Sequence, residues 1–194
     1  MSGVSAGASV RDKQLEVFYD FVKRLVKGFE KAGLDYAFTG ALAVSFYGVP
    51  RTTVDVDVVV WVAEGKHEAK LVLALREAEL VVDEGEIDKA LESGYRIATF
   101  RDGKTPYSVD VILSDKKFEK RAGTVAGLRT FFQTPEDLVL AKLRMIRATV
   151  PRERALKDEE DIRAVLKFAE VDVEAVKRQA RRDSTLGIFE ALMV

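Results

Sequence analysis

Residues 38–62 read FTGALAVSFYGVPRTTVDVDVVVWV, and this stretch joins a glycine-containing turn to a strand that carries two aspartates. From Val54 to Val62 the residues are β-branched or aromatic except for Asp55 and Asp57, which is a strand composition. Because side chains alternate along a strand, the even-numbered valines share one face and both aspartates share the other. The sequence therefore predicts a strand with one core face and one face that begins with two carboxylates.

The two carboxylates of this strand repel each other. At a separation of roughly 6–7 Å and an effective dielectric constant of about 20, the repulsion amounts to about 2–3 kcal/mol. A divalent cation, Mg²⁺ or Mn²⁺, is the natural compensation for such a pair. The alternative interpretation is that Asp55 and Asp57 stand at an exposed strand end, where water solvates them.

A third carboxylate, Asp110, interrupts a second valine-rich strand at residues 107–113. If the two strands are neighbours in one sheet, Asp55, Asp57 and Asp110 converge on one site. The three acids together are therefore a more specific signal than an isolated Asp-x-Asp pair.

A candidate phosphate site precedes the acidic strand. Residues 36–39 predict a short strand, Gly40 a turn, and Ala41 to Tyr47 a short helix. The N–H groups of the first helical turn have no partner within the helix and face the turn. Such a helix start is a place where phosphate binds.

These features together resemble the signature of the polymerase-beta type nucleotidyltransferase superfamily, which consists here of Gly40-Ala41, Asp55-Val56-Asp57-Val58 and Asp110. The spacing is similar to that of the minimal and AbiEii-like nucleotidyltransferases in the segment Arg51-x-Thr53-x-Asp55-x-Asp57. The resemblance covers residues 35–113. Ala41 stands where the family has Gly or Ser, so that one hydroxyl contact to phosphate is lost while the Ala41 N–H remains.

The resemblance implies an α/β (α+β) fold with a mixed β-sheet, helices mainly on one face, and further helices at the C-terminus. It also implies that Asp55, Asp57 and Asp110 bind two Mg²⁺ (or Mn²⁺) ions that neutralise the triphosphate of an NTP substrate. Asp110 would in addition be the general base for the acceptor hydroxyl.

The resemblance also assigns the residues that hold the phosphates. Gly40 and the N–H of Ala41 would cradle the β- and γ-phosphates, aided by Arg51 and Lys142. For Arg51, which precedes the acids, a structural ion pair is the alternative to a phosphate contact. Lys142 resembles the lysine that related enzymes place on the helix after the sheet, and the alternative is a lysine on a solvated face.

Three hypotheses about function follow. The first is transfer of NMP from an NTP to an unidentified acceptor hydroxyl on a protein, a tRNA or a small molecule. The second is a nucleotide-binding but weakly catalytic regulatory module, comparable to a toxin–antitoxin component. The third is a scaffold in which the acids are incidental.

The composition is that of an ordinary globular protein. The chain has 194 residues, a net charge of −1 and no cysteine, which excludes disulfides, thiolate metal sites and a large electrostatic attraction to nucleic acid. Its one histidine, His67, lies among charged residues and is predicted at the surface. No apolar run reaches the ~20 residues of a membrane span. We therefore expect a cytoplasmic protein without a membrane partner, and the sequence does not define its oligomeric state.

The chain divides into a disordered tail at residues 1–10, a nucleotidyltransferase-like domain at residues 11–148 and a C-terminal helical region at residues 149–194. Strands are predicted at 35–39, 54–62, 95–100, 107–113 and 128–132. Helices are predicted at 11–31, 41–47, 68–79, 86–92, 115–121, 135–146, from 157 onward, and at 173–182.

The sequence marks the start of two helices in the C-terminal half of the chain. Thr134 and Pro135 predict a helix start with a side-chain cap. Asp158 and Asp161 open a later helix, where acids suit the positive end of the helix dipole, and we interpret them as capping and surface residues. The alternative is a functional role, since this segment also resembles the Lys-x-Asp-x-x-Asp-type helix start that follows the catalytic domain in AbiEii-like proteins.

Overall fold

The computed structural model describes residues 10–51, 53–62 and 68–193. The predicted tail lies outside these residues except for Val10, at which the first helix begins, and His67 also lies outside them. In chain order the elements are α1 Val10–Ala32, β1 Tyr36–Phe38, α2 Gly40–Phe46, β2 Asp55–Trp61, α3 Glu68–Glu77, β3 Leu80–Val81, α4 Glu84–Glu92, β4 Ile97–Asp102, β5 Ser108–Ser114, β6 Lys120–Val125, β7 Leu128–Gln133, α5 Pro135–Ala148, the 3-10 helix η1 Arg152–Ala155, α6 Leu156–Phe168, α7 Val173–Arg182 and α8 Leu186–Leu192.

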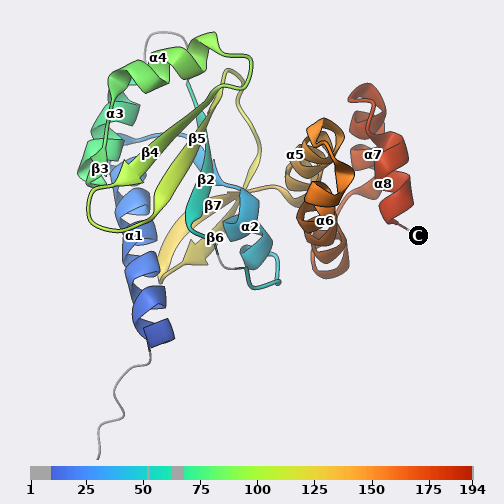
Figure 1. The fold of residues 1–194 in the computed structure, drawn as a ribbon, viewed down its shortest axis with the longest axis horizontal. Helices are drawn as coiled ribbons and strands as arrows, with labels where there is room; N and C mark the ends of the chain where they lie inside the picture. Colours follow the sequence, from blue (N-terminus) through green and yellow to red (C-terminus); the bar gives the residue numbers. More distant parts are fainter. Residues whose placement is uncertain (1–9, 52, 63–67, 194) are drawn as a thin grey trace, which may run out of the picture.

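The described strands form one mixed sheet in the order β3-β4-β5-β2-β1-β7-β6. The pairs β2–β5 and β1–β7 are parallel, whereas the other neighbours are antiparallel. Figure 1 shows α1 and α3 side by side against the sheet, and the helices α5 to α8 grouped beyond α2. The predicted α/β class with a mixed sheet and C-terminal helices is thus confirmed.

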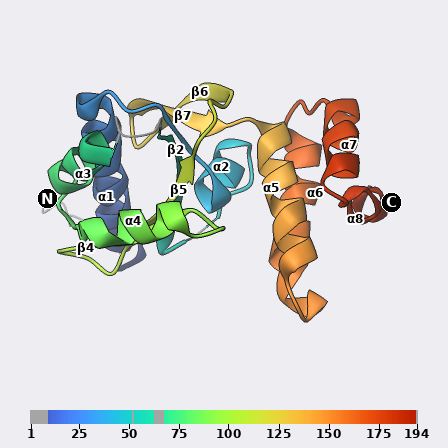
Figure 2. The same cartoon turned by 90° about the horizontal axis from the view of Figure 1, so that it is seen from above.

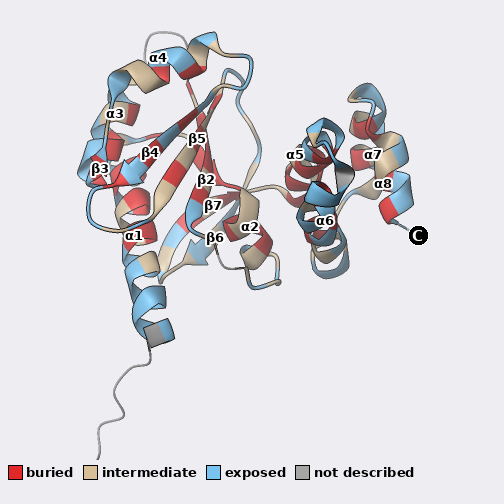
Figure 3. Ribbon diagram, in the orientation of Figure 1, coloured by how far each residue is buried: buried red, intermediate tan, exposed pale blue. Residues whose placement is uncertain are grey.

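The alternation of side chains on β2 and β5 separates a core face from an open face. Val56, Val58 and Val60 of β2 are completely buried, and Val109 and Val111 of β5 are buried beside them. The two covering helices complete this core with buried side chains, which are Phe21, Leu25 and Phe29 of α1 and Leu71, Ala74 and Leu75 of α3. Figure 3 shows this buried strip along the central strands. The odd-numbered residues of β2, including both aspartates, therefore point away from α1 and α3.

Helix α2 is held against the sheet by an aromatic stack. The ring of Phe46 lies 4.1 Å from that of Phe132 on β7, with 2° between the ring planes. Gly123 on β6 leaves the space for this stack, because a Cβ there would lie 2.4 Å from the Phe46 ring. The contact fixes the turn at the start of α2 relative to the strands.

The helix predicted at residues 115–121 is wrong. Residues 115–119 form no regular element, and β6 begins at Lys120 and pairs with β7 along its whole length. Ala126 and Gly127 connect the two strands with φ values of +51° and +80°, the positive values that a tight hairpin turn requires. The backbone hydrogen bonds between β6 and β7 stabilise the strand more than the local sequence pattern of residues 115–121 favours a helix. The sequence also gave no indication of β3 or α8.

The C-terminal helices pack on one another through α5. Figure 2 shows α5, α6 and α7 adjacent when the molecule is seen from above, and both α6 and α7 contact α5. The predicted cap of α5 is present, since Thr134 Oγ1 accepts a hydrogen bond from the N–H of Asp137 at 3.2 Å. Among the helices that the structure describes, none combines the length and apolar character needed to span a membrane.

The contact between α1 and α3 provides a test of the fold. A Cβ at Gly28 of α1 would lie 2.5 Å from the carbonyl oxygen of Ala74 on α3. We expect Gly28→Ala to lower the free energy of unfolding by about 1–3 kcal/mol, because overpacking outweighs the ~1 kcal/mol that alanine gains over glycine in a helix. Urea unfolding measures this difference.

The matched control is Gly187→Ala in α8, where a Cβ meets no atom within 4 Å. This variant should be as stable as the original protein or up to ~1 kcal/mol more stable. Equal stabilisation by both substitutions would show that α1 and α3 do not approach as closely as described.

Candidate active site

The three predicted aspartates share the open face of the sheet. In the parallel pair of β2 and β5, Asp57 lies opposite Asp110 and Asp55 lies opposite Ser108. Residues opposite each other in neighbouring strands point to the same side of a sheet, and Asp55 is two residues from Asp57 on the same strand. The register therefore places the Asp57 and Asp110 side chains next to each other, with Asp55 one step along the face.

The turn at Gly40 lies directly against Asp57. The N–H of Thr39 donates to the carbonyl oxygen of Asp57 at 3.0 Å. Gly40 has a φ of +57°, and a Cβ at this position would lie 1.9 Å from Oδ2 of Asp57. Both the backbone conformation and the lack of space require glycine here. The predicted phosphate turn and the predicted acidic strand thus meet.

The Asp57 carboxyl is destabilised in its charged form. Its pKa is raised to about 6, first because burial removes water from the carboxylate and second because the charge of Asp110 repels it, with a smaller contribution from Asp55. Lys142 and Lys157 act in the opposite direction. Burial and the neighbouring carboxylates together thus outweigh the two lysines and disfavour the charged form of Asp57.

Two hydroxyl groups orient the other aspartates. Ser108 Oγ donates to Oδ1 of Asp55, and Thr99 Oγ1 on β4 donates to Oδ1 of Asp110 at 2.6 Å. Neither residue was predicted from the sequence. Alternation along β5 could have identified Ser108, which shares a face with Asp110, whereas Thr99 depends on the register between β4 and β5.

The three carboxylates are chemically suited to bind Mg²⁺, but their side chains are not arranged around one common point. Within the described part of the chain, no three Asp, Glu, His or Cys side chains stand close enough together to hold one metal ion. The hydroxyl bonds of Asp55 and Asp110 direct one oxygen of each carboxylate elsewhere. Carboxylate oxygens are nevertheless the ligands that Mg²⁺ and Mn²⁺ prefer, and the pKa of Asp57 is raised by burial first and by the charge of Asp110 second. The residues thus fit a divalent cation chemically, provided that the side chains reorient.

The two predicted phosphate-binding cations are both paired in the structure. Arg51 Nη1 lies 2.9 Å from Oδ1 of Asp161. Lys142 Nζ lies 2.7 Å from Oδ2 of Asp161 and 2.9 Å from Oδ1 of Asp158. The prediction that Asp161 is a capping surface residue is wrong, because it is 2% exposed and pairs with cations from two other segments. Asp158 does not cap α6 either, since the helix begins after Ala155 without a side-chain cap.

Ala41 lies in the first turn of α2, next to Gly40. The N-cap residue Thr39 makes no side-chain hydrogen bond to this turn, because its hydroxyl donates to Oε1 of Gln133. The carbonyl oxygen of Ala41 accepts from Ser45 Oγ at 3.0 Å. The predicted role of Gly40 and Ala41 in holding phosphate remains a prediction that this local geometry permits.

A hollow of about 810 Å³ adjoins the open face. Val59 of β2 and Ser114 of β5 line it from the sheet, and Asp137, Arg144 and the other lining residues come from the loop after β5, β6, β7, α5 and α7. Burial raises the pKa of Asp137. The hollow therefore borders the aspartate-bearing face of the sheet at Val59 and Ser114 and reaches the C-terminal helices, but none of the site residues predicted from the sequence lines it.

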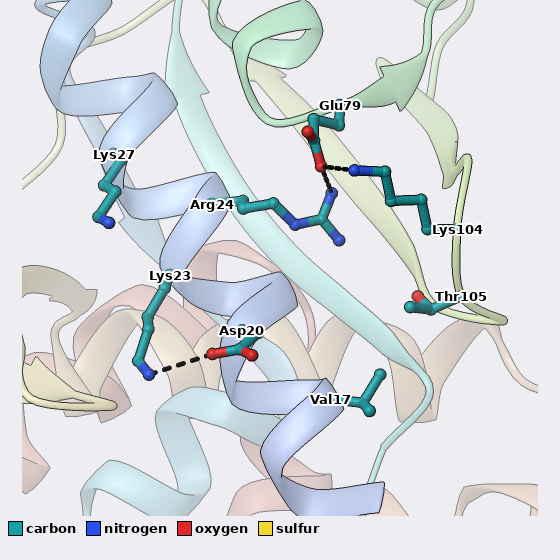
Figure 4. A pocket seen from close by; sticks show the side chains of 8 residues that line it. All are labelled: Val17, Asp20, Lys23, Arg24, Lys27, Glu79, Lys104 and Thr105. Carbon is teal, nitrogen blue, oxygen red and sulfur yellow. Dashed lines mark hydrogen bonds and ion pairs between the residues drawn. The ribbon is translucent and has the colours of Figure 1, made fainter.

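A second hollow, of about 430 Å³, lies beside α1 (Figure 4). Arg24 crosses it to reach Glu79 at 3.2 Å and the buried carboxylate of Asp102 at 2.7 Å, and Lys104 also pairs with Glu79. None of the site residues predicted from the sequence lines this hollow. Its paired charges join α1 to the edge of the sheet.

The strand order and the helices around the sheet define a protein with the nucleotidyltransferase fold. Solved structures with this fold include the antibiotic-resistance factor ANT(2'')-Ia in solution, with 14% sequence identity and a TM-score of 0.64 over 91% of this chain and 98% of that one. The crystal structure of ANT(2'')-Ia in complex with adenylyl-2''-tobramycin has 13% sequence identity to this chain and a TM-score of 0.63, over 87% of this chain and 99% of that one. A nucleotidyltransferase-like protein from Paracoccidioides brasiliensis is 18% identical, with a TM-score of 0.55 over 87% and 92% of the two chains. No protein-family model matches the sequence, and neither does any curated protein.

The raised pKa of Asp57 predicts how stability depends on pH in the metal-free protein. Below about pH 4 the carboxyl is mostly protonated in both the folded and the unfolded state. Between about pH 4 and pH 6 the unfolded state ionises while the folded state stays largely protonated, which lowers the free energy of unfolding by up to about 3 kcal/mol once the pH is above 6. Asp57→Asn should therefore be more stable than the original protein at neutral pH and equally stable near pH 4. Urea unfolding with a chelator present measures both.

Asp88→Asn, on the exposed side of α4, is the control for loss of one carboxylate. It should follow the original protein across the pH range. A difference between Asp57→Asn and the original protein that does not change with pH would contradict the electrostatic origin assigned to the raised pKa.

Proposed function

We propose that this chain is a nucleotidyltransferase that transfers NMP from an NTP to an acceptor hydroxyl with the help of Mg²⁺ or Mn²⁺. The observation that carries the proposal is the register that sets Asp57 beside Asp110, on the face where the Gly40 turn meets the strand. The fold shared with ANT(2'')-Ia supports it. Within that fold we assign the chain to the minimal, AbiEii-like group on the Arg51-x-Thr53-x-Asp55-x-Asp57 spacing.

Asp55, Asp57 and Asp110 would hold the divalent cations, two in number if the mechanism follows the superfamily. When bound, such ions neutralise the triphosphate and stabilise charge on the attacking and leaving oxygens. The rise in the pKa of Asp57 gives these carboxylates a physical reason to bind cations, because a bound cation removes the repulsion.

In this proposal Asp110 accepts the proton of the acceptor hydroxyl. Its Oδ1 accepts the hydrogen bond from Thr99, so Oδ2 is the oxygen that takes the proton. The freed acceptor oxygen then forms a bond to the α-phosphorus, the bond from that phosphorus to the bridging oxygen breaks, and pyrophosphate leaves.

The hollow between the sheet and the C-terminal helices offers room for the acceptor. It borders the open face at Val59 and Ser114, and at about 810 Å³ it can contain a sizeable small molecule or part of a macromolecule. Its lining mixes acidic and basic side chains, which favours a polar acceptor. ANT(2'')-Ia was crystallised with an adenylylated tobramycin, a polar small molecule, and we take a small polar acceptor as the first class to test.

A second candidate is a module that binds nucleotide with little turnover, such as a regulatory component of a toxin–antitoxin pair. Ala41, which lacks the hydroxyl that the family usually provides at this turn, favours it. The two candidates differ in one result, because the module binds NTP and metal without forming a labelled product.

The test is incubation of the protein with each α-³²P-labelled NTP, Mg²⁺ or Mn²⁺ and a cell extract, followed by separation of labelled products. We expect one NTP to label an acceptor. Asp57→Asn should reduce labelling by about 100-fold or more, because loss of a catalytic group typically has at least that effect. Asp88→Asn, which loses an exposed carboxylate far from the aspartate cluster in sequence, should label normally.

Calorimetry with each NTP and Mg²⁺ accompanies the labelling experiment. Binding without product would favour the regulatory module. Labelling that persists in Asp57→Asn, or a protein that binds none of the four NTPs, would contradict the proposed activity.

A further inference from the structure

One buried carboxylate joins the C-terminal helices to the candidate active site. Asp161 of α6 lies between Arg51, in the loop before β2, and Lys142, on α5. It is 2% exposed, and the side chains of both cations are less than one-fifth exposed. Three segments that are far apart in sequence therefore meet at this carboxylate.

The contacts of Asp161 leave donors on both cations. Oδ1 of Asp161 lies 2.9 Å from Arg51 Nη1 but has no well-aligned hydrogen bond, so the guanidinium is held by one ion-pair contact and not by a two-point fork. A guanidinium carries five N–H donors and an ammonium three. Lys142 directs Nζ at Asp158 and Asp161, which accounts for two of its three donors. Counting only contacts between residues that the structure describes, the two cations are thus held in place with N–H donors left over.

Both cations belong to the surroundings of the aspartate face. The N–H of Arg51 donates to Ser45 Oγ at 2.9 Å, which ties the loop to α2, the helix that begins at Gly40. Lys142 lies close enough to Asp57 to lower its pKa. Lys142 is therefore near the aspartate face, and Arg51 is joined to Lys142 through Asp161.

We propose that Asp161 is a positioning residue for the triphosphate, which holds Arg51 and Lys142 where their remaining donors bind phosphate oxygens. The proposal rests on the proposed function. Arg and Lys side chains have many rotamers, and holding them before the ligand arrives reduces the entropy lost on binding. On this view the C-terminal helices complete the nucleotide site.

The opposite role would be competition, in which Asp161 occupies the cations and phosphate must displace it. Two observations favour positioning. The carboxylate is nearly inaccessible, so a ligand cannot replace it without moving α6, and the ion-pair group of Arg51, Lys142, Asp158 and Asp161 leaves N–H donors over. The two roles predict opposite changes in affinity.

The test measures binding of Mg²⁺ with each of the four NTPs, and separately of inorganic tripolyphosphate, by calorimetry. Asp161→Asn should weaken both kinds of ligand by about tenfold, the typical effect of one charge-assisted contact. Asp161→Glu should restore part of the affinity. Glu160→Gln, an exposed neighbour on α6 that loses the same charge, should bind within about twofold of the original protein.

A second variant separates positioning from a general loss of structure. Arg51→Gln leaves Asp161 paired with Lys142, so it folds without an unpaired buried carboxylate, and it should also lose about tenfold in tripolyphosphate affinity. If Asp161 acts through Arg51, the double variant should lose clearly less than the product of the two single losses. Multiplicative losses would indicate independent structural damage and overturn the proposal.

The remaining outcomes are also decisive. Tighter binding by Asp161→Asn, or affinities of Asp161→Asn and Arg51→Gln that both stay within about twofold of the original protein, would overturn positioning. Binding of tripolyphosphate but of no NTP, with the loss in Asp161→Asn, would retain the positioning role and reject the nucleotidyltransferase function. A protein that binds neither ligand rejects both.

Discussion

The parallel register between β2 and β5 is the constraint on which the site depends. It sets Asp57 directly beside Asp110 while it buries Val56 and Val58 on the other face. A shift of one residue would turn the valines outward and the aspartates into the core, so the hydrophobic pattern of the two strands fixes the register. The fold thus enforces a juxtaposition of like charges that neither strand would favour alone, and in the proposed function a divalent cation relieves it.

The turn at Gly40 converts this charged face into a shaped site. Asp57 fills the space that a Cβ at Gly40 would take, and the stack of Phe46 on Phe132 holds α2 against the sheet. On the far side, Asp161 connects Arg51 and Lys142 to α6. The acidic strand, the turn and the C-terminal helices are therefore mechanically linked, so that a change in any one of them affects the surroundings of Asp57.

Much of this arrangement was predictable from the sequence because its causes are local. Alternation along residues 54–62 and 107–113 identified β2, β5 and the face of the three aspartates, and the residues around Thr134 identified the start of α5. The β6–β7 hairpin was missed because its pairing depends on the turn at Ala126 and Gly127 and not on the composition of residues 115–121. The contact of Thr99 with Asp110 depends on the register between β4 and β5, and the burial of Asp161 depends on the packing of α6, neither of which is a local property.

The most direct test of the site is paramagnetic broadening of ¹⁵N NMR signals by Mn²⁺ in the presence of a non-hydrolysable NTP analogue, since broadening reports which backbone amides lie near the ion. If the aspartate face and the Gly40 turn bind metal and nucleotide together, the amides of Gly40, Ala41, Asp57 and Asp110 lose intensity first. The same titration with Asp57→Asn should leave them sharp. Broadening centred instead on another acidic group, such as Glu79 and Asp102 beside α1, would contradict this assignment of the site.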